Sequence, residues 1–407
     1  MVEEVRIESL GAQGDGVTAD DVFIPGTLPG ERVRADISGH RGRLLGVLAP
    51  AADRISPVCP HFGSCGGCRL QHASDGLLAG WKRDLVHRAL SARGIEDVEI
   101  LPTETSPAAS RRRATLTGRR TRKGAVVGFH AQGSEEIVAV ETCPVAVPEI
   151  TAILPALRRI VAEGASRKGE LRLTVTASEA GLDVAVTGGK PVEGGLYGEL
   201  VAVAATANLA RLSWNGESVV TRRPPVQMMG QARVEPPPGG FLQATVHAEA
   251  VLVVAMRRAT DGARRIADLF AGSGTFALPL AENAEVHAVE SEAEALAALD
   301  TAWRATPGLK KVGTETRDLF HRPLLTREFD PFDAVVFDPP RQGARAQVAE
   351  LARSGIARIG AVSCNPATFA RDARILIVGG FMLDWVQPVD QFRWSPHIEL
   401  AAAFERK

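Results

Sequence analysis

One cysteine, Cys364, stands between a short apolar stretch and an Asn-Pro pair in the segment AVSCNPATFARD. A thiol in a loop that follows a strand is a candidate nucleophile, because a structural cysteine more often lies within a strand or on a helix face. A helix is expected to begin at TFARDARIL, and a helix N-terminus lowers the pKa of a nearby thiol. We therefore expect Cys364 to be reactive, with a structural cysteine as the alternative.

A nucleophile of this kind needs a base, and the candidate is Glu399 in the segment HIELAAAFERK. It lies on the last expected strand, close to His397. Taken by itself, Glu399 would be interpreted as an ordinary exposed strand residue. Glu399 becomes a candidate base only because the sequence also contains the candidate nucleophile Cys364.

A glycine-rich turn in DLFAGSGTFALPLA follows an expected strand. Gly272 and Gly274 let the backbone turn sharply and approach a ligand. Glu290 ends the next expected strand, where a carboxylate can bind ribose hydroxyls. The segment has no phosphate-loop lysine, and Ala277 replaces the third Rossmann glycine. These features favour an adenosine-containing ligand without a triphosphate. S-adenosylmethionine is the preferred candidate, and NAD is the second. A purely structural turn is the alternative.

The segment FDPPR places Asp338 and two prolines directly after another expected strand. The carboxyl ends of the strands form the ligand-binding rim of an open α/β sheet. The prolines stiffen the loop and remove backbone donors. Asp338 is therefore a candidate ligand contact, and a cap on a strand-ending turn is the alternative.

Four further cysteines lie far upstream of Cys364. Three of them, Cys59, Cys65 and Cys68, share the segment CPHFGSCGGCRLQH with a C-x5-C-x2-C spacing. Cys143 would be the natural fourth ligand of a metal bound by these three. This grouping predicts a metal site. Thiolate ligation suits zinc or an iron–sulfur cluster, and the spacing does not choose between them.

The elements that must position these residues fall into three zones. Residues 1–52 contain short alternating runs separated by Gly and Pro, which predict a small antiparallel β-barrel. Residues 53–240 are irregular and end in a linker, RVEPPPGG. Residues 241–407 alternate strands with helices and predict a doubly wound parallel sheet. Their last two strands have a short connection, which favours an antiparallel ending.

The composition is that of a soluble globular protein, with 45% hydrophobic and 23% charged residues and a net charge of −1. No apolar run is long enough to span a membrane, and the N-terminus does not resemble a signal peptide. We expect a cytoplasmic protein with reduced thiols. The basic run 111–123 is either a solvated strand face or a phosphate-contacting patch.

Four segments in this order resemble the RNA (uracil-5-)-methyltransferase family, and they are DLFAGSGTF, FDPPRQG, SCNPATFARD and HIEL. The N-terminal zone is similar to a TRAM domain, an OB-like RNA-binding barrel. The resemblance covers nearly the whole chain. It implies a class I, Rossmann-like methyltransferase domain at the C-terminus, and a central domain that carries a [4Fe–4S] cluster in preference to zinc.

The resemblance also implies roles for individual residues. Cys364 would add to uracil carbon 6, and Glu399 would remove the carbon-5 proton after S-adenosylmethionine has donated its methyl group. The residues expected to contact the cofactor, or to lie where it meets the base, are Gln243, Phe270, Glu290 and Asp338. The Asp-Pro loop has no second cysteine, which favours uracil over cytosine as the target.

This chain departs from the family pattern at Thr245, Ala271 and Thr275, where many members have Asn, Cys and Asn. The departures concern ligand contacts and not the chemistry.

The expected substrate is RNA. We expect 23S ribosomal RNA in preference to the transfer-RNA T-loop. No obligate protein partner is evident. A non-catalytic RNA-binding protein on the same scaffold would have lost Cys364 or Glu399. A methyltransferase for an exocyclic amine would leave Cys364 without a role.

Overall fold

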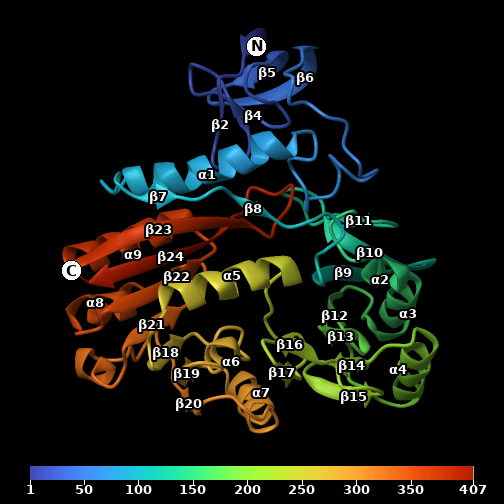
Figure 1. Ribbon diagram of the computed structural model, residues 1–407. Coiled ribbons are helices and arrows are strands. Elements are labelled where there is room, and N and C mark those ends of the chain that lie inside the picture. The colour runs from blue at the N-terminus through green and yellow to red at the C-terminus, as the bar shows by residue number, and fades with distance from the viewer. Residues whose placement is uncertain (407) are drawn as a thin grey trace.

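The computed structural model describes residues 1–406, which form three main sheets (Figure 1). The N-terminal sheet has six strands in the order β1-β5-β6-β4-β3-β2. Their bounds are Val2–Arg6 (β1), Ser9–Leu10 (β2), Gly16–Val17 (β3), Phe23–Ile24 (β4), Arg32–Ser38 (β5) and Arg41–Ala49 (β6). Alternate residues of β5 are buried in a small core with Ile7 and Ile24. The strand pairing does not by itself close a barrel, so the predicted barrel stays a prediction.

The central sheet has seven strands in the order β11-β10-β9-β12-β13-β14-β15. Their bounds are Arg113–Thr121 (β9), Gly124–His130 (β10), Ile137–Ala139 (β11), Glu170–Ser178 (β12), Gly181–Thr187 (β13), Arg211–Trp214 (β14) and Glu217–Thr221 (β15). Three helices accompany it, α2 (Pro148–Ala152), α3 (Leu154–Gly164) and α4 (Gly195–Thr206). The apolar face of α3 packs on β9 and β10 through residues such as Leu157 and Val161. A hairpin of β16 (Gln227–Met229) and β17 (Ala232–Val234) follows.

The C-terminal sheet has the order β20-β19-β18-β21-β22-β24-β23-β7. The strands of its C-terminal part are β18 (Arg265–Leu269), β19 (Glu285–Glu290), β20 (Val312–Thr316), β21 (Ala334–Phe337), β22 (Arg358–Ser363), β23 (Phe381–Asp390) and β24 (Glu399–Arg406). Strands β18 to β22 pair in parallel, whereas β24 is antiparallel to both of its neighbours. The sheet therefore has the expected parallel body and the expected antiparallel last strand.

Helices cover both faces of this sheet (Figure 1). They are α5 (Val246–Ala259), α6 (Ala277–Leu280), α7 (Ala293–Arg304), α8 (Arg345–Arg353) and α9 (Pro366–Val378), with a 3-10 turn, η1 (Thr326–Phe329). Leu252 and Met256 of α5 lie in the core on one face, and Val348 and Leu376 of α8 and α9 lie in the core on the other. Double coverage explains why β21 is a run of four buried residues without alternation.

Part of the predicted central zone joins the C-terminal sheet. The short strands β7 (Glu99–Ile100) and β8 (Glu104–Thr105) both pair in parallel with β23. The preceding helix, α1 (Asp75–Ser91), packs on α9 and β23 and lies between the N-terminal and C-terminal sheets in Figure 1. No local pattern in the sequence predicts this association, and the division at residues 52 and 240 stays a prediction. Within residues 1–406, no helix combines the length and the apolar character that crossing a bilayer requires.

Candidate active site

Three of the predicted residues lie at the carboxyl end of a parallel strand. Glu290 ends β19, Asp338 follows β21, and Cys364 follows β22. Because these strands run in the same direction, their carboxyl ends meet at one rim of the sheet. The fold thus brings together residues that are as much as 74 positions apart in the sequence.

The antiparallel strand β24 brings Glu399 to the same rim. Ser363 pairs with Leu400 at the end of the ladder between β22 and β24. Cys364 directly follows β22, and Glu399 is the first residue of β24, so the thiol and the carboxyl group lie beside each other. Glu399 is only 4% exposed. It is therefore not the ordinary exposed strand residue that was its alternative interpretation.

The loop that carries Cys364 is tied to the Asp-Pro-Pro loop. Asn365 caps helix α9 by accepting a hydrogen bond from the backbone N–H of Ala367 at 3.1 Å. The side chains of Asn365 and Thr368 both donate to the carbonyl oxygen of Arg341 at 3.2 Å. These bonds hold the two loops together.

The protonation state of Cys364 differs from the expectation. Burial, together with the neighbouring carboxylates of Glu399 and Asp338, raises the pKa of the thiol to about 11. The start of α9 was expected to lower this pKa, and that expectation is wrong for this structure. Desolvation and two nearby negative charges outweigh a helix terminus, because both disfavour the thiolate directly.

The two carboxyl groups at the rim are themselves perturbed. Burial is the main cause of the raised pKa of Glu399, and the Asp338 carboxylate adds to it. Burial also raises the pKa of Asp338 to about 7, although a hydrogen bond from Gln243 opposes this. A third carboxyl group, Asp268 on β18, is fully buried, and burial and Asp338 raise its pKa. Asp268 was not among the predicted site residues.

Gln243 and Gln391 connect the carboxyl groups. The side-chain amide of Gln243 donates to Asp338 Oδ2 at 3.1 Å. Gln391 donates to Gln243 Oε1 at 2.7 Å and to Glu399 Oε2 at 2.8 Å. Gln243 was expected near the cofactor, but Gln391 was missed, since a single glutamine in an irregular segment carries no recognisable pattern.

The glycine-rich turn has a strained, tightly bonded backbone. Phe270 has a φ of 62°, which is in the left-handed region. Gly274 has a φ of 101°, and a Cβ there would come within 2.9 Å of Leu278. The backbone N–H of Gly272 donates to Glu290 Oε2 at 3.1 Å. The turn is therefore fixed to the carboxylate proposed to hold a ribose.

Thr245, one of the departures from the family pattern, has a structural role here. Its hydroxyl caps helix α5 by accepting a hydrogen bond from the backbone N–H of Ala248 at 3.0 Å. Ser106, in the segment after β8, lies 2.8 Å from the same hydroxyl. The departure is thus compatible with a well-formed helix start beside Gln243.

A groove of about 660 Å³ opens at Cys364. One wall comes from the N-terminal sheet, including Leu10 and Phe23, and another from α1, including Arg88. Arg341 of the Asp-Pro-Pro loop completes the cationic part of the lining. Three regions of the sequence therefore enclose the approach to the candidate nucleophile.

The four upstream cysteines line a single cavity of about 310 Å³. They are Cys59, Cys65, Cys68 and Cys143. Burial, together with the three neighbouring thiols, raises the pKa of Cys68 to about 11. Within residues 1–406, no three His, Cys, Asp or Glu side chains converge closely enough to hold a metal ion. The predicted metal site therefore stays a prediction, although the four residues do meet.

The basic run 111–123 divides into two parts. Arg112 is buried and forms an ion pair with Glu249, and Arg113 donates to the carbonyl oxygen of Gly239 at 2.9 Å. These arginines hold the central sheet against the segment that carries Gln243. The basic side chains at the β9–β10 turn are exposed instead. The buried part of the run is therefore neither a solvated strand face nor a phosphate-contacting patch.

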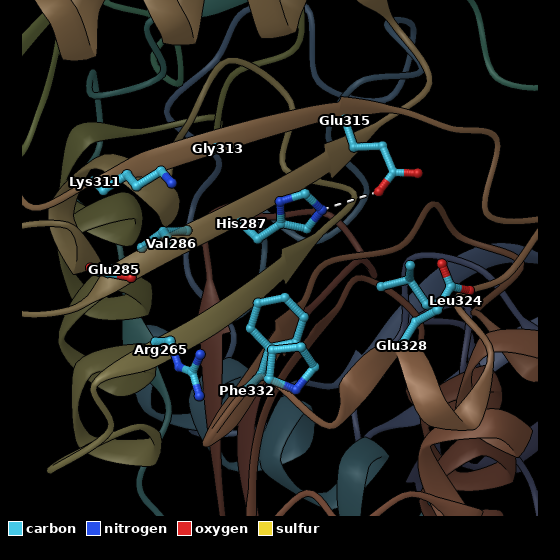
Figure 2. A pocket seen from close by; sticks show the side chains of 11 residues that line it. Arg265, Glu285, Val286, His287, Lys311, Gly313, Glu315, Leu324, Glu328 and Phe332 are labelled. Atoms are coloured by element: carbon cyan, nitrogen blue, oxygen red, sulfur yellow. Dashed lines mark hydrogen bonds and ion pairs between the residues drawn. The ribbon is translucent and has the colours of Figure 1, made fainter.

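A second groove, shown in Figure 2, lies away from this rim and has a volume of about 290 Å³. His287 lies 3.1 Å from Glu315 and stacks on Phe332, while Arg265 lines the groove near the start of β18. Within residues 1–406, none of the predicted site residues lines it.

The comparisons with known proteins agree with this arrangement. The chain is 46% identical over 416 residues to an uncharacterized RNA methyltransferase of Caulobacter vibrioides, with both chains covered completely. It is 31% identical to the 23S rRNA (uracil(1939)-C(5))-methyltransferase RlmD of Vibrio vulnificus, covering 99% of this chain and 96% of that one.

The solved structure of the Pyrococcus abyssi tRNA (uracil-54, C5)-methyltransferase shares the fold. The TM-score is 0.78 at 22% identity, over 98% of this chain and 99% of that one. A scan against family models found no match. The extent and identity of the matches to its relatives show that this chain belongs to the family of RNA methyltransferases.

Proposed function

We propose that this enzyme methylates carbon 5 of a uridine in RNA with S-adenosylmethionine as the methyl donor. The observation that carries the proposal is the position of Cys364 beside Glu399 at a rim that also holds Asp338. Methylation of an exocyclic amine needs no thiol and would leave this pairing unexplained. A non-catalytic RNA-binding protein would have no use for a buried carboxyl group next to a thiol.

The proposed reaction begins with the Cys364 thiolate, which adds to carbon 6 of the uracil and turns carbon 5 into an enolate nucleophile. Carbon 5 then takes the methyl group of S-adenosylmethionine, which leaves as S-adenosylhomocysteine. Glu399 removes the proton from carbon 5, and the electrons of that C–H bond restore the double bond between carbons 5 and 6. The C6–S bond breaks at the same time and releases the thiolate. The target base must leave its stack to reach Cys364.

The chain's residues fit the methyl donor. Glu290, the proposed ribose contact, accepts hydrogen bonds from the backbone N–H groups of Gly272 and Ser291 at 3.1 and 2.6 Å. A side chain at Gly272 would meet no atom within 4 Å, so the turn leaves open space there for a ligand. Phe270, Gln243 and Asp338 complete the proposed contacts. The Pyrococcus abyssi structure contains S-adenosyl-L-homocysteine, which supports the same class of ligand here.

We favour 23S ribosomal RNA as the substrate. The Vibrio vulnificus relative, whose name gives that substrate, is 31% identical, whereas the transfer-RNA enzyme of Pyrococcus abyssi is 22% identical. The transfer-RNA T-loop is the second candidate, because the latter structure matches nearly the whole chain. In either case the N-terminal sheet would bind RNA as a TRAM-like domain, and the groove at Cys364 would receive the target nucleotide.

We further propose that the four-cysteine cavity holds a [4Fe–4S] cluster. Four thiols around one cavity suit either zinc or an iron–sulfur cluster. We favour the cluster because the C-x5-C-x2-C grouping with a remote fourth cysteine resembles the [4Fe–4S] subgroup of the family. Arg111 and Arg113 line this cavity with no carboxylate, which suits a negatively charged group. Methyl transfer moves no net electrons, so the proposed role is structural.

The decisive experiment uses RNA that contains 5-fluorouridine, together with S-adenosylmethionine. Fluorine at carbon 5 blocks the proton removal, so a covalent protein–RNA adduct should accumulate. The Cys364→Ala variant should form none, and mapping the cross-linked nucleotide would identify the substrate. The mechanism is excluded if wild-type protein forms no adduct on an RNA that it methylates, or if the variant forms as much.

A further inference from the structure

The orientation of the Gln391 side chain is determined by a backbone group. Its Oε1 accepts a hydrogen bond from the backbone N–H of Ala244 at 2.7 Å, so Nε2 must point the other way. The two hydrogens of Nε2 then have two partners, Gln243 Oε1 and Glu399 Oε2. The reversed amide would face these acceptor oxygens with its own oxygen. Gln391 is 2% exposed, so water cannot replace these bonds.

This orientation has a consequence for the base. Oε2 of Glu399 is committed to Gln391, and no hydrogen bond to Oε1 occurs within residues 1–406. Oε1 is therefore the oxygen available to a substrate. The same amide aligns Gln243, whose Nε2 donates to Asp338 Oδ2. One side chain thus fixes the geometry of both carboxyl groups at the rim.

We propose that Gln391 is a positioning residue that directs Glu399 Oε1 at the carbon-5 proton and holds it in register with the loop of Asp338. This inference rests on the proposed function, since it assigns a step of that reaction. Gln391 does not itself touch the reacting atoms.

The segment around Gln391 is built to keep it in place. The preceding residue, Asp390, forms a buried ion pair with Lys82 of α1. Trp394 is buried among apolar residues of the N-terminal sheet and of α1, with a φ of 60°. Its carbonyl oxygen accepts hydrogen bonds from the backbone N–H groups of Arg69 and Leu70 at 2.9 and 3.0 Å. A non-glycine residue in this conformation persists only where its surroundings impose it.

The steps of the proposed reaction differ in whether they use Glu399. Addition of Cys364 and methyl transfer do not use Glu399, but proton removal does. A loss of the Gln391 amide should therefore slow the last step far more than the two earlier steps, which it reaches only through Gln243. The methylated, covalent protein–RNA intermediate should accumulate on ordinary uridine RNA, because its breakdown becomes limiting.

The test compares Gln391→Met with wild-type protein at saturating S-adenosylmethionine. Met has a similar volume and no amide. Gln347→Met is the control. Gln347 of α8 is also buried, and its side chain bonds only the backbone of Leu324 and none of the proposed site residues. We expect kcat on uridine RNA to fall about 10- to 100-fold in Gln391→Met, since a positioned base contributes at least that much. The control variant should retain wild-type kcat.

Two readouts distinguish positioning from a loss of folding. Gln391→Met should form the 5-fluorouridine adduct within about threefold of the wild-type rate, and a methylated adduct on uridine RNA should become visible on denaturing gels. Equal slowing of both reactions without an accumulated adduct would overturn the inference. If wild-type protein formed no 5-fluorouridine adduct, the proposed function would fail instead.

Discussion

The ammonium nitrogen of Lys82 lies 2.5 Å from Asp390 Oδ1, and both side chains are buried. This ion pair joins α1, near the start of the chain, to the last residue of β23. Asp390 also accepts a hydrogen bond from the backbone N–H of Phe392 at 3.0 Å, so the pair fixes the chain on both sides of Gln391.

Replacing Lys82 by Met should lower the free energy of unfolding by about 3–5 kcal/mol, because it leaves the Asp390 carboxylate buried without its partner. Adding Asp390→Asn should recover part of this loss, since the amide oxygen can still accept from Phe392. Urea unfolding of the two variants measures both effects. The exposed pair of Arg304 and Asp300 is the control, and Arg304→Met should change little. Equal stabilities of Lys82→Met and wild type would contradict the assignment.

The rate of adduct formation with 5-fluorouridine RNA should rise with pH. The pKa of the Cys364 thiol is raised to about 11, so the thiolate fraction increases about tenfold per pH unit between pH 6.5 and 9. Fluorine removes the contribution of proton abstraction by Glu399, so the profile reports the thiol. Rapid-quench measurements over this range provide the test.

Asp338→Asn serves as the control for this profile. The Asp338 carboxylate raises the pKa of Cys364, so its removal should make the profile level off at a lower pH, which measurements extended to pH 11 would show even if the absolute rate falls. A rate that did not change from pH 6.5 to 9 in wild-type protein would show that the bound RNA lowers the thiol pKa well below its value in the free enzyme.

Anaerobically purified protein should contain about four iron and four sulfide per chain if the proposed cluster is present. Cys68→Ser should lose most of both and the associated visible absorbance, because Cys68 lines the cavity with the other three thiols. Cys364→Ser should retain them, since its thiol opens into the other groove. A colourless wild-type protein with stoichiometric zinc would refute the cluster.

The sequence was sufficient to place the candidate residues at strand ends. Alternation of apolar strands and helices predicted a parallel sheet, and the carboxyl ends of parallel strands meet at one rim whatever else the chain does. Glu290, Asp338 and Cys364 follow from that rule alone. The grouping of Cys59, Cys65 and Cys68 was also visible, because their spacing is short.

Tertiary structure decided the position of Glu399 and the role of Gln391. The insertion of β24 beside β22 places Glu399 next to the thiol, and strand order is not encoded in any local pattern. Gln391 acts through three side-chain hydrogen bonds to distant residues, and a glutamine has no local signature for such contacts.

Burial is the physical reason why other expectations changed. The start of α9 suggested a lowered pKa for Cys364, but desolvation and two carboxylates raise it. Arg112 belongs to a run that suggested phosphate contacts, yet it is enclosed with Glu249. The sequence by itself determined which chemical groups are present and on which elements they lie. Only the folded chain determined their neighbours and their distance from water, and these set the charge and the partners of each group.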